Sequence, residues 1–226
     1  EVGIFRTGPW LLELSAREIF LILGLATLPV VVYVVWLLPG ATVRFTVWLL
    51  SHTVYRVRIE GRENLPVAGG ALLVANHVSW VDGVLLILHA PRPIRMVAYA
   101  DYIQSWWIRW LAKDMGAIPI KPGKRSVIES LRTAREALRS GELVCVFPEG
   151  HITRTAQLQE FQPGFLSMVN NTGAPVIPVY LGGLWGSIFS YERGKFFWKR
   201  PRQWPYPVRI RIGKPIEQPR DAHEVR

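Results

Sequence analysis

Short apolar runs separated by polar stretches recur along most of the chain from residue 54 onward. Four of them have the length and the β-branched content of buried strands, at Ala71–Ala75, Ile94–Tyr99, Leu143–Phe147 and Val208–Ile212. Ala174–Tyr180 has the same composition, but Pro178 predicts an interruption there. Val54–Ile59 alternates between apolar and polar residues and predicts a half-buried strand.

Helical patterns lie between these strands. Val84–His89 follows the Ala71 run, Tyr102–Met115 is rich in tryptophan, and Ser126–Arg139 has clean helical periodicity that stops before Gly141. Strands that alternate with helices predict an α/β fold with a mostly parallel sheet flanked by helices. The last residues, Asp221–Arg226, are expected to form a polar tail.

The first fifty residues follow a different pattern. Ile19–Leu38 carries no charged residue and is long enough to span a bilayer core of ~30 Å, although Pro29 lies in its middle. Ala41–Tyr55 is again apolar but includes Arg44 and His52. We expect residues 1–53 to form a helical hairpin that inserts in the membrane, and residues 54–226 to form the α/β domain. A true span and a buried helix pair of a soluble core are the alternatives.

Composition narrows the choice of partners. The chain has 226 residues and a net charge of +10, which favours anionic partners such as nucleic acid or anionic lipid. Ten tryptophans among the basic residues favour the membrane interface. The single cysteine, Cys145, excludes an internal disulfide and a cysteine-based zinc site. Its apolar surroundings predict a core residue and not a nucleophile.

The segment Asn76–Asp82 lies where a predicted strand ends and a helix begins, the place at which ligands bind in open α/β sheets. His77 and Asp82 have a His-x4-Asp spacing, which a strand-to-helix turn can close. A carboxylate on the second ring nitrogen would let His77 act as a general base. Because no Gly-x-Ser-x-Gly elbow occurs, the target would be a substrate hydroxyl. Alternatively, Asp82 caps a helix and His77 is a buried polar group.

A second polar segment, Phe147–Arg154, also begins where a buried strand ends. Parallel strands place such ends on one side of the sheet, so this segment can face His77. Glu149 and Gly150 offer a carboxylate and an approachable backbone, and Arg154 offers a planar fork for a phosphate. An ordinary turn and a surface ion pair are the alternatives for these residues.

Together, Asn-His-x-Ser-x-x-Asp and the later Phe-Pro-Glu-Gly with Arg154 resemble the glycerolipid acyltransferase family, in its lysophosphatidic acid acyltransferase-like group. Two weaker blocks follow the family's order, at Gly116–Lys121 and Val176–Val179. The resemblance runs from about Val54 to Ile216.

This resemblance implies a membrane-bound enzyme that moves a fatty acyl group from a thioester, on acyl carrier protein or coenzyme A, to a lysophospholipid hydroxyl. It implies a general-base dyad of His77 and Asp82, an acceptor site of Glu149, Gly150 and Arg154, and a second phosphate contact from Lys121. The oxyanion would be stabilised by backbone amides near Gly150, or by the positively charged side chain of Arg95 or Lys121. No cofactor or metal is expected. The implied location is the bacterial inner membrane, with the active site at the cytoplasmic face.

Gly182–Ser190 and Gly194–Trp198 look like the acyltransferase part of bacterial 2-acylglycerophosphoethanolamine acyltransferase/acyl-carrier-protein synthetase. That subgroup implies lysophosphatidylethanolamine as the acceptor, with lysophosphatidic acid as the alternative. Its members can be fused to a lysophospholipid transporter and an acyl-activating synthetase, which would explain a chain that starts without methionine.

Basic and aromatic residues are mixed between Tyr191 and Arg211. We interpret this segment as a dock for a membrane surface or an acidic carrier, with a solvated loop as the alternative. Nucleic-acid binders use similar mixtures, but the chain has no RNP-like or helix-turn-helix pattern, so no nucleic acid is expected. A non-catalytic lipid- or partner-binding module is the remaining alternative to an enzyme.

Overall fold

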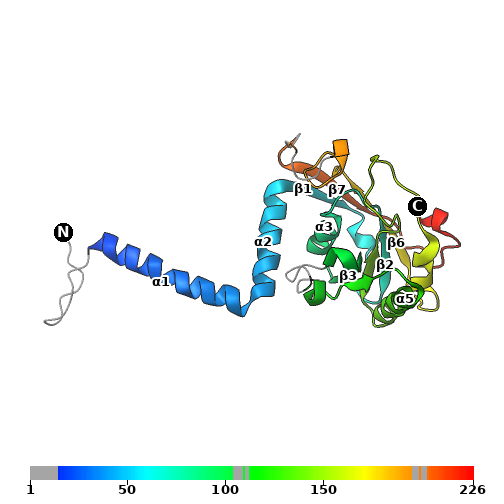
Figure 1. Cartoon of the computed structure of the whole chain (residues 1–226), viewed down its shortest axis with the longest axis horizontal. Coiled ribbons are helices and arrows are strands. Elements are labelled where there is room, and N and C mark those ends of the chain that lie inside the picture. Colours follow the sequence, from blue (N-terminus) through cyan, green and yellow to red (C-terminus); the bar gives the residue numbers. More distant parts are fainter. Residues whose placement is uncertain (1–14, 104–108, 110–111, 195–198, 200–202) are drawn as a thin grey trace. The chain divides into compact units, whose positions relative to one another are not determined.

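The computed structural model describes residues 15–103, 109, 112–194, 199 and 203–226 (Figure 1). The chain forms two compact units, residues 1–47 and 48–226. The middle of the predicted tryptophan-rich helix over Tyr102–Met115 and the middle of the basic and aromatic segment after Tyr191 lie outside the described residues, apart from residues 109 and 199.

Helix α1 (Ala16–Leu37) makes up most of the described part of the first unit. Ser15 begins it with a capping box, in which the Ser15 side chain accepts from the Glu18 amide and the Glu18 carboxylate accepts from the Ser15 amide. The helix runs through Pro29, and none of its residues is buried. By length and composition α1 is able to cross a membrane, which agrees with the predicted apolar N-terminal element.

Helix α2 (Pro39–Val54) follows directly. Leu38 separates the two helices with non-helical dihedral angles (φ −125°, ψ 56°), as expected for a residue that precedes proline. Proline at the first position of α2 loses no hydrogen bond there. The chain therefore has the two consecutive apolar helices that the hairpin required, and their mode of membrane insertion stays a prediction.

The second unit is built on a seven-stranded sheet in the order β1-β7-β6-β2-β5-β3-β4. The strands are β1 (Tyr55–Glu60), β2 (Ala71–Ala75), β3 (Ile94–Tyr99), β4 (Ile118–Ile120), β5 (Leu143–Val146), β6 (Val176–Gly182) and β7 (Tyr206–Ile212). The five neighbouring strands β6, β2, β5, β3 and β4 run parallel to one another. Strand β7 is antiparallel to β6 and parallel to β1. The predicted mostly parallel α/β fold is confirmed.

Helices cover both faces of this sheet. Side chains such as Leu73 and Cys145 pack with α3 (Asp82–His89), and burial raises the pKa of the Cys145 thiol. Alternate residues such as Leu72 and Val144 pack on the opposite face with α5 (Lys124–Arg139). Shorter helices are α6 (Leu166–Val169), α7 (Ala222–Val225) and the 3₁₀ turns η1 (Arg62–Asn64), η2 (Ala100–Ile103), η3 (Pro163–Phe165) and η4 (Glu192–Gly194).

Two details of the fold differ from the sequence expectation. Pro178 does not interrupt β6. The Leu72 amide of β2 donates to the Pro175 carbonyl, and hydrogen-bonding groups alternate in direction along a strand, so only every second residue of β6, counted from Pro175, bonds to β2. Pro178 faces the other neighbour, so its missing N–H removes no bond to β2. The expected polar tail contains α7, which Asp221 caps through the amides of His223 and Glu224. Val225 of this helix is buried against the α5 side of the sheet.

Candidate active site

The strand order creates a crevice between the neighbouring strands β2 and β5. After β2 the chain passes through α3 on one face of the sheet toward β3, and after β5 it passes through η3 and α6 on the other face toward β6. Connections that leave adjacent parallel strands in opposite directions open a cleft at their carboxyl ends. His77 follows β2 and Phe147 follows β5, so the two candidate segments meet in this cleft.

Asp82 anchors the turn Asn76–Asp82, which we call the β2 turn. Its side chain is fully buried, and its Oδ2 accepts hydrogen bonds from His77 Nδ1 (2.9 Å), the Val78 amide (2.6 Å) and the Ser79 amide (2.8 Å). Its Oδ1 accepts from Ser79 Oγ (2.5 Å). Because a carboxylate only accepts, His77 carries its hydrogen on Nδ1, which leaves Nε2 available to take a proton.

The imidazole ring of His77 is held on a flat support. It stacks on the Phe147 ring with 4.1 Å between centroids and 12° between planes. The side chain of His77 keeps 20% of its surface exposed and lines a cavity. The hydrogen bond to Asp82 and the stacking on Phe147 together fix the direction of the free ring nitrogen.

Glu149 joins the β2 turn to the segment Phe147–Thr155, which we call the β5 loop. Its Oε1 accepts from the His77 amide (2.7 Å) and its Oε2 from the Gln159 amide (3.0 Å). The residue is only 3% exposed and is absent from the cavity lining, unlike its neighbours Pro148 and Gly150. Both carboxylate oxygens thus bond to backbone groups behind the site.

Further bonds fix the same two segments. The Thr153 amide donates to the His77 carbonyl (2.8 Å). The Asn76 side chain accepts from the Leu181 amide (2.6 Å) and donates to the Leu181 carbonyl (3.0 Å). Asn76 therefore continues the pairing of β2 with β6 by one residue, and the turn begins from a fixed point.

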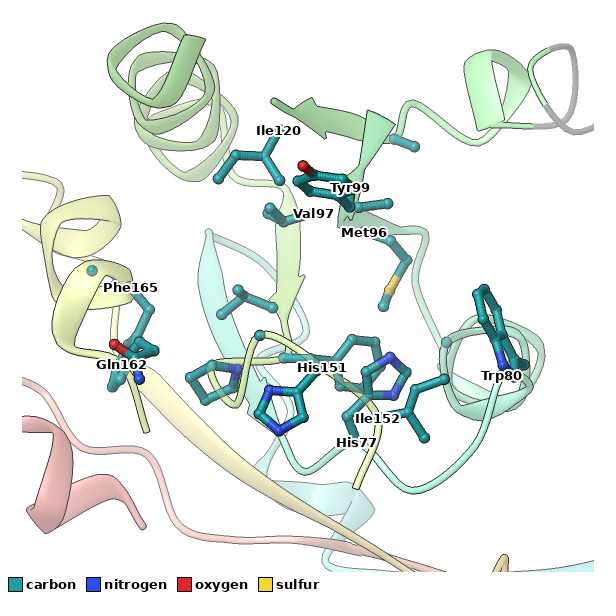
Figure 2. Close-up of a pocket in the computed structure, with 18 of the residues that line it drawn as sticks. His77, Trp80, Met96, Val97, Tyr99, Ile120, His151, Ile152, Gln162 and Phe165 are labelled. Carbon is teal, nitrogen blue, oxygen red and sulfur yellow. The ribbon is translucent and has the colours of Figure 1, made fainter. Parts of the chain in front are cut away.

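An apolar cavity of about 1140 Å³ extends from His77 through the second unit. Figure 2 shows His77 and His151 at one end, and Val97, Tyr99 and Ile120 at the other. Met96, Phe165, Met168 and the inner side of α5, at Val127 and Leu131, add to its apolar wall. Such a lining with a few polar groups at one end suits a long hydrocarbon chain with a reactive head.

The candidate cations take separate positions. Arg154 is exposed, lines the cavity and lies over the Tyr191 ring at 5.6 Å from its centroid. Lys121 is also exposed and lines the cavity beyond Ile120. Arg95 bonds instead to the Gly116 carbonyl (2.6 Å) and Glu142 (3.1 Å) near the start of β3. It lies outside the cavity lining, so the expectation that Arg95 stabilises an oxyanion is wrong.

The structure therefore brings together His77, Asp82, Glu149 and Gly150, with Arg154 at the opening and Lys121 across the cavity. Sequence reasoning missed the contributions of Ser79, Phe147 and Gln159. Ser79 and Phe147 lie inside the quoted motifs, whereas no pattern pointed to Gln159. In the described part of the chain, no group of three or more His, Cys, Asp or Glu side chains is placed to hold a metal ion.

Comparison with known proteins gives the family. The acyltransferase family model matches residues 56–182. Because this match covers more than half of the chain, the chain belongs to the acyltransferase family, and the family expected from the sequence is confirmed. The matched residues include both the β2 turn and the β5 loop.

The relatives include two 1-acyl-sn-glycerol-3-phosphate acyltransferases. A chloroplastic 1-acyl-sn-glycerol-3-phosphate acyltransferase of Arabidopsis thaliana is 31% identical over 57% of this chain and 36% of its own length. A 1-acyl-sn-glycerol-3-phosphate acyltransferase of Bacillus subtilis is 28% identical over 74% of this chain and 77% of its own length. This chain thus spans about a third of the plant relative's length.

A solved structure supports the fold. The 1-acyl-sn-glycerophosphate acyltransferase of Thermotoga maritima superimposes with a TM-score of 0.57 and 22% identity, over 77% of this chain and 69% of that one. At this level of identity the likeness concerns the fold alone, and it agrees with a parallel sheet between two helical layers.

Proposed function

We propose that this chain transfers a fatty acyl group from a thioester to the free hydroxyl of a lysophospholipid. The observation that carries the proposal is the His77–Asp82 hydrogen bond of 2.9 Å at one end of a long apolar cavity. A proton acceptor is thereby held beside a space suited to a fatty acyl chain. Membership of the acyltransferase family supports the same chemistry.

In the proposed reaction, Nε2 of His77 takes the proton of the lysophospholipid hydroxyl while its oxygen bonds to the thioester carbonyl carbon. The tetrahedral intermediate then collapses, the carbon–sulfur bond breaks, and the imidazolium returns the proton to the departing sulfur. Asp82 stabilises the imidazolium charge through Nδ1. General-base catalysis of this kind contributes about 10²–10⁴-fold to the rate.

For Glu149 we propose a role other than the acceptor contact that the sequence resemblance implied. We propose that it positions His77 through the backbone amide, because both of its oxygens are already occupied by amides of His77 and Gln159. Recognition of the acceptor then rests on Arg154, whose exposed guanidinium reaches the cavity opening and suits a phosphate. Gly150 brings its backbone to the same wall.

The headgroup of the acceptor has two candidates. The narrower sequence resemblance favours lysophosphatidylethanolamine, whereas the names of the Arabidopsis and Bacillus relatives favour lysophosphatidic acid. Both carry the phosphate that Arg154 would bind. We propose that α1 anchors the chain in a bacterial inner membrane and that no cofactor besides the thioester substrate takes part.

The test is acyl transfer by the purified chain in detergent micelles. Each acceptor is offered with an acyl carrier protein thioester and with a coenzyme A thioester, beside the His77→Ala variant. We expect transfer by the wild type and a loss of about 10²–10⁴-fold in the variant. Binding of lysophospholipid without transfer of acyl groups would favour a non-catalytic lipid-binding module. The preferred acceptor identifies the headgroup.

A further inference from the structure

A second imidazole, which the proposed reaction does not use, lies at the catalytic end of the cavity. His151 is exposed and lines the cavity together with His77. Figure 2 shows both residues at the same end. Within the described residues, the side chain of His151 forms no hydrogen bond, ion pair or ring contact. Its N–H is therefore available to a ligand that enters the cavity.

The backbone on both sides of His151 is fixed, although its side chain is exposed. On one side, the Gly150 amide donates to the Phe147 carbonyl (3.1 Å), and Gly150 has a φ of 73°, which glycine adopts without strain. On the other side, the Thr153 amide donates to the His77 carbonyl (2.8 Å). An accessible side chain on a backbone that is bonded to the catalytic residue is well placed to hold a substrate in one geometry.

The β5 loop presents two side-chain nitrogen donors to the cavity, His151 and Arg154. Arg154 contacts the Tyr191 ring, and a guanidinium keeps its N–H groups for other partners in such a contact. Thr155 and Gln159 also line the cavity, but Gln159 Nε2 already donates to Thr155 Oγ1 (3.1 Å). A ligand with several acceptor oxygens at this end would therefore meet His151 and Arg154 first.

The chemistry of the two substrates decides which group reaches His151. In a lysophospholipid, the free hydroxyl and the phosphate ester lie on neighbouring or next-neighbouring carbons of one glycerol. When the hydroxyl is at Nε2 of His77, the phosphate must therefore lie at the same end of the cavity. In the thioester donor, by contrast, the nearest phosphate is separated from the reacting sulfur by the pantetheine arm. The phosphate that has to lie near the base is that of the acceptor.

We propose that His151 donates a hydrogen bond to the phosphate of the bound lysophospholipid and holds it together with Arg154. The inference rests on the proposed function, since it assumes a lysophospholipid acceptor, and it adds a second residue to the acceptor site. Because the phosphate is anionic, the bond is a charge-assisted one. Two donors on one phosphate restrict the rotation of the headgroup, so that the hydroxyl stays directed at His77.

The experiment measures the binding of each lysophospholipid in detergent micelles, without thioester, to the full-length wild type, His151→Ala and His151→Arg. We expect the Kd to rise about tenfold in His151→Ala, since a hydrogen bond to a charged group is lost. His151→Arg, which keeps a donor, should restore most of the affinity. A monoacylglycerol, which has the chain and the hydroxyl but no phosphate, should bind to wild type and His151→Ala equally. The matched control is His223→Ala, at an exposed histidine of α7 outside the cavity lining, and should leave each Kd unchanged.

Steady-state transfer then separates the roles that a histidine can have at this place. In His151→Ala the KM for lysophospholipid should rise with the Kd, while kcat and the KM for a coenzyme A thioester stay unchanged. An unchanged Kd for both lysophospholipids would overturn the proposal. A lower kcat with an unchanged Kd would overturn it in favour of proton transfer, and a higher KM for the thioester alone in favour of a donor phosphate. Binding without thioester needs no turnover, so failure of the proposed function is seen separately, as no transfer by the wild type.

Discussion

The β2 turn and the β5 loop face each other across the same crevice, but they are built differently. In the β2 turn the polar side chains of Asn76, Ser79 and Asp82 are buried, and each is bonded within the protein. In the β5 loop, by contrast, His151 and Arg154 are exposed and line the cavity opening. Internal bonds thus hold all three polar side chains of the β2 turn, whereas the β5 loop, which Glu149 and Thr153 also fasten, presents two polar side chains to the cavity.

This difference separates the two tasks of the proposed enzyme. Proton transfer requires a base held in one geometry, and buried hydrogen bonds supply that rigidity. Recognition of a headgroup requires accessible charge, which an exposed arginine supplies. We therefore expect changes in the β2 turn to lower kcat and changes at the exposed residues of the β5 loop to raise KM.

The largest effect is expected for Asp82→Asn. The amide oxygen can replace Oδ2 as acceptor for His77 and the two backbone amides, while the NH₂ group donates to Ser79 Oγ. The fold should survive, but the negative charge that stabilises the imidazolium is lost. We expect kcat to fall about 10²–10⁴-fold in steady-state acyl transfer.

A thermal unfolding curve accompanies that assay as its control. An unfolding midpoint close to that of the wild type would assign the lost activity to chemistry. Full turnover by a folded Asp82→Asn protein would refute the role of the carboxylate.

The second-largest effect is expected for Glu149→Gln, which tests whether Glu149 of the β5 loop helps to hold His77 in place. Glutamine has a single acceptor oxygen, so its NH₂ group would face the amide of either His77 or Gln159. An unsatisfied buried amide destabilises by about 1–3 kcal/mol, and His77 would shift. We expect kcat to fall about tenfold or more with little change in the KM for lysophospholipid. A rise in that KM alone would restore Glu149 to the acceptor site.

A smaller effect is expected for Arg154→Ala, which changes an exposed residue of the β5 loop. Removal of the guanidinium should raise the KM for lysophospholipid about tenfold, because a charge-assisted hydrogen bond is worth about 1.5–3 kcal/mol. The value of kcat should stay near that of the wild type. Arg154→Lys, which keeps the charge but loses the planar fork, should lie between the two. An unchanged KM in both variants would place the phosphate elsewhere.

The sequence predicted much of this arrangement because local patterns specify it. Strands β2 and β3 have the bounds that their apolar runs predicted, at Ala71–Ala75 and Ile94–Tyr99. The contact of His77 with Asp82 followed from their spacing within a strand-to-helix turn. The meeting of that turn with Phe147 followed from the parallel order of the strands.

The remainder depends on contacts that no local pattern encodes. Glu149 was expected to bind the acceptor because it belongs to the Phe-Pro-Glu-Gly motif, and only the fold shows that both of its oxygens accept from the amides of His77 and Gln159. Arg95 was one candidate for stabilising the oxyanion, but a residue near the start of a strand lies far from the carboxyl edge of the sheet. Asp221–Arg226 looked polar, yet one buried residue, Val225, fastens it to the core.

The smallest effect is expected for the pH dependence of stability at His89, the last residue of α3, the helix that begins at Asp82 of the β2 turn. Its half-buried ring lies 5.3 Å from that of His52, and its Nδ1 bonds to the Leu85 carbonyl (2.9 Å). Burial lowers the pKa of His89 below its usual 6.5, and the nearby His52 and Arg62 add to this effect. The unfolded chain therefore binds a proton more readily than the folded chain, so stability should decline as the pH falls below about 6.5.

His89→Phe keeps a ring for the stack but removes this titration. Thermal unfolding of both proteins at about pH 7.5 and about pH 5.5 measures the contribution. We expect the wild type to lose more stability than the variant between these two values, with kcat for acyl transfer little changed at the higher pH. Equal losses in the two proteins would show that protonation of His89 does not loosen α3. The rigidity of the β2 turn would then depend on the bonds around Asp82 and not on the far end of the helix.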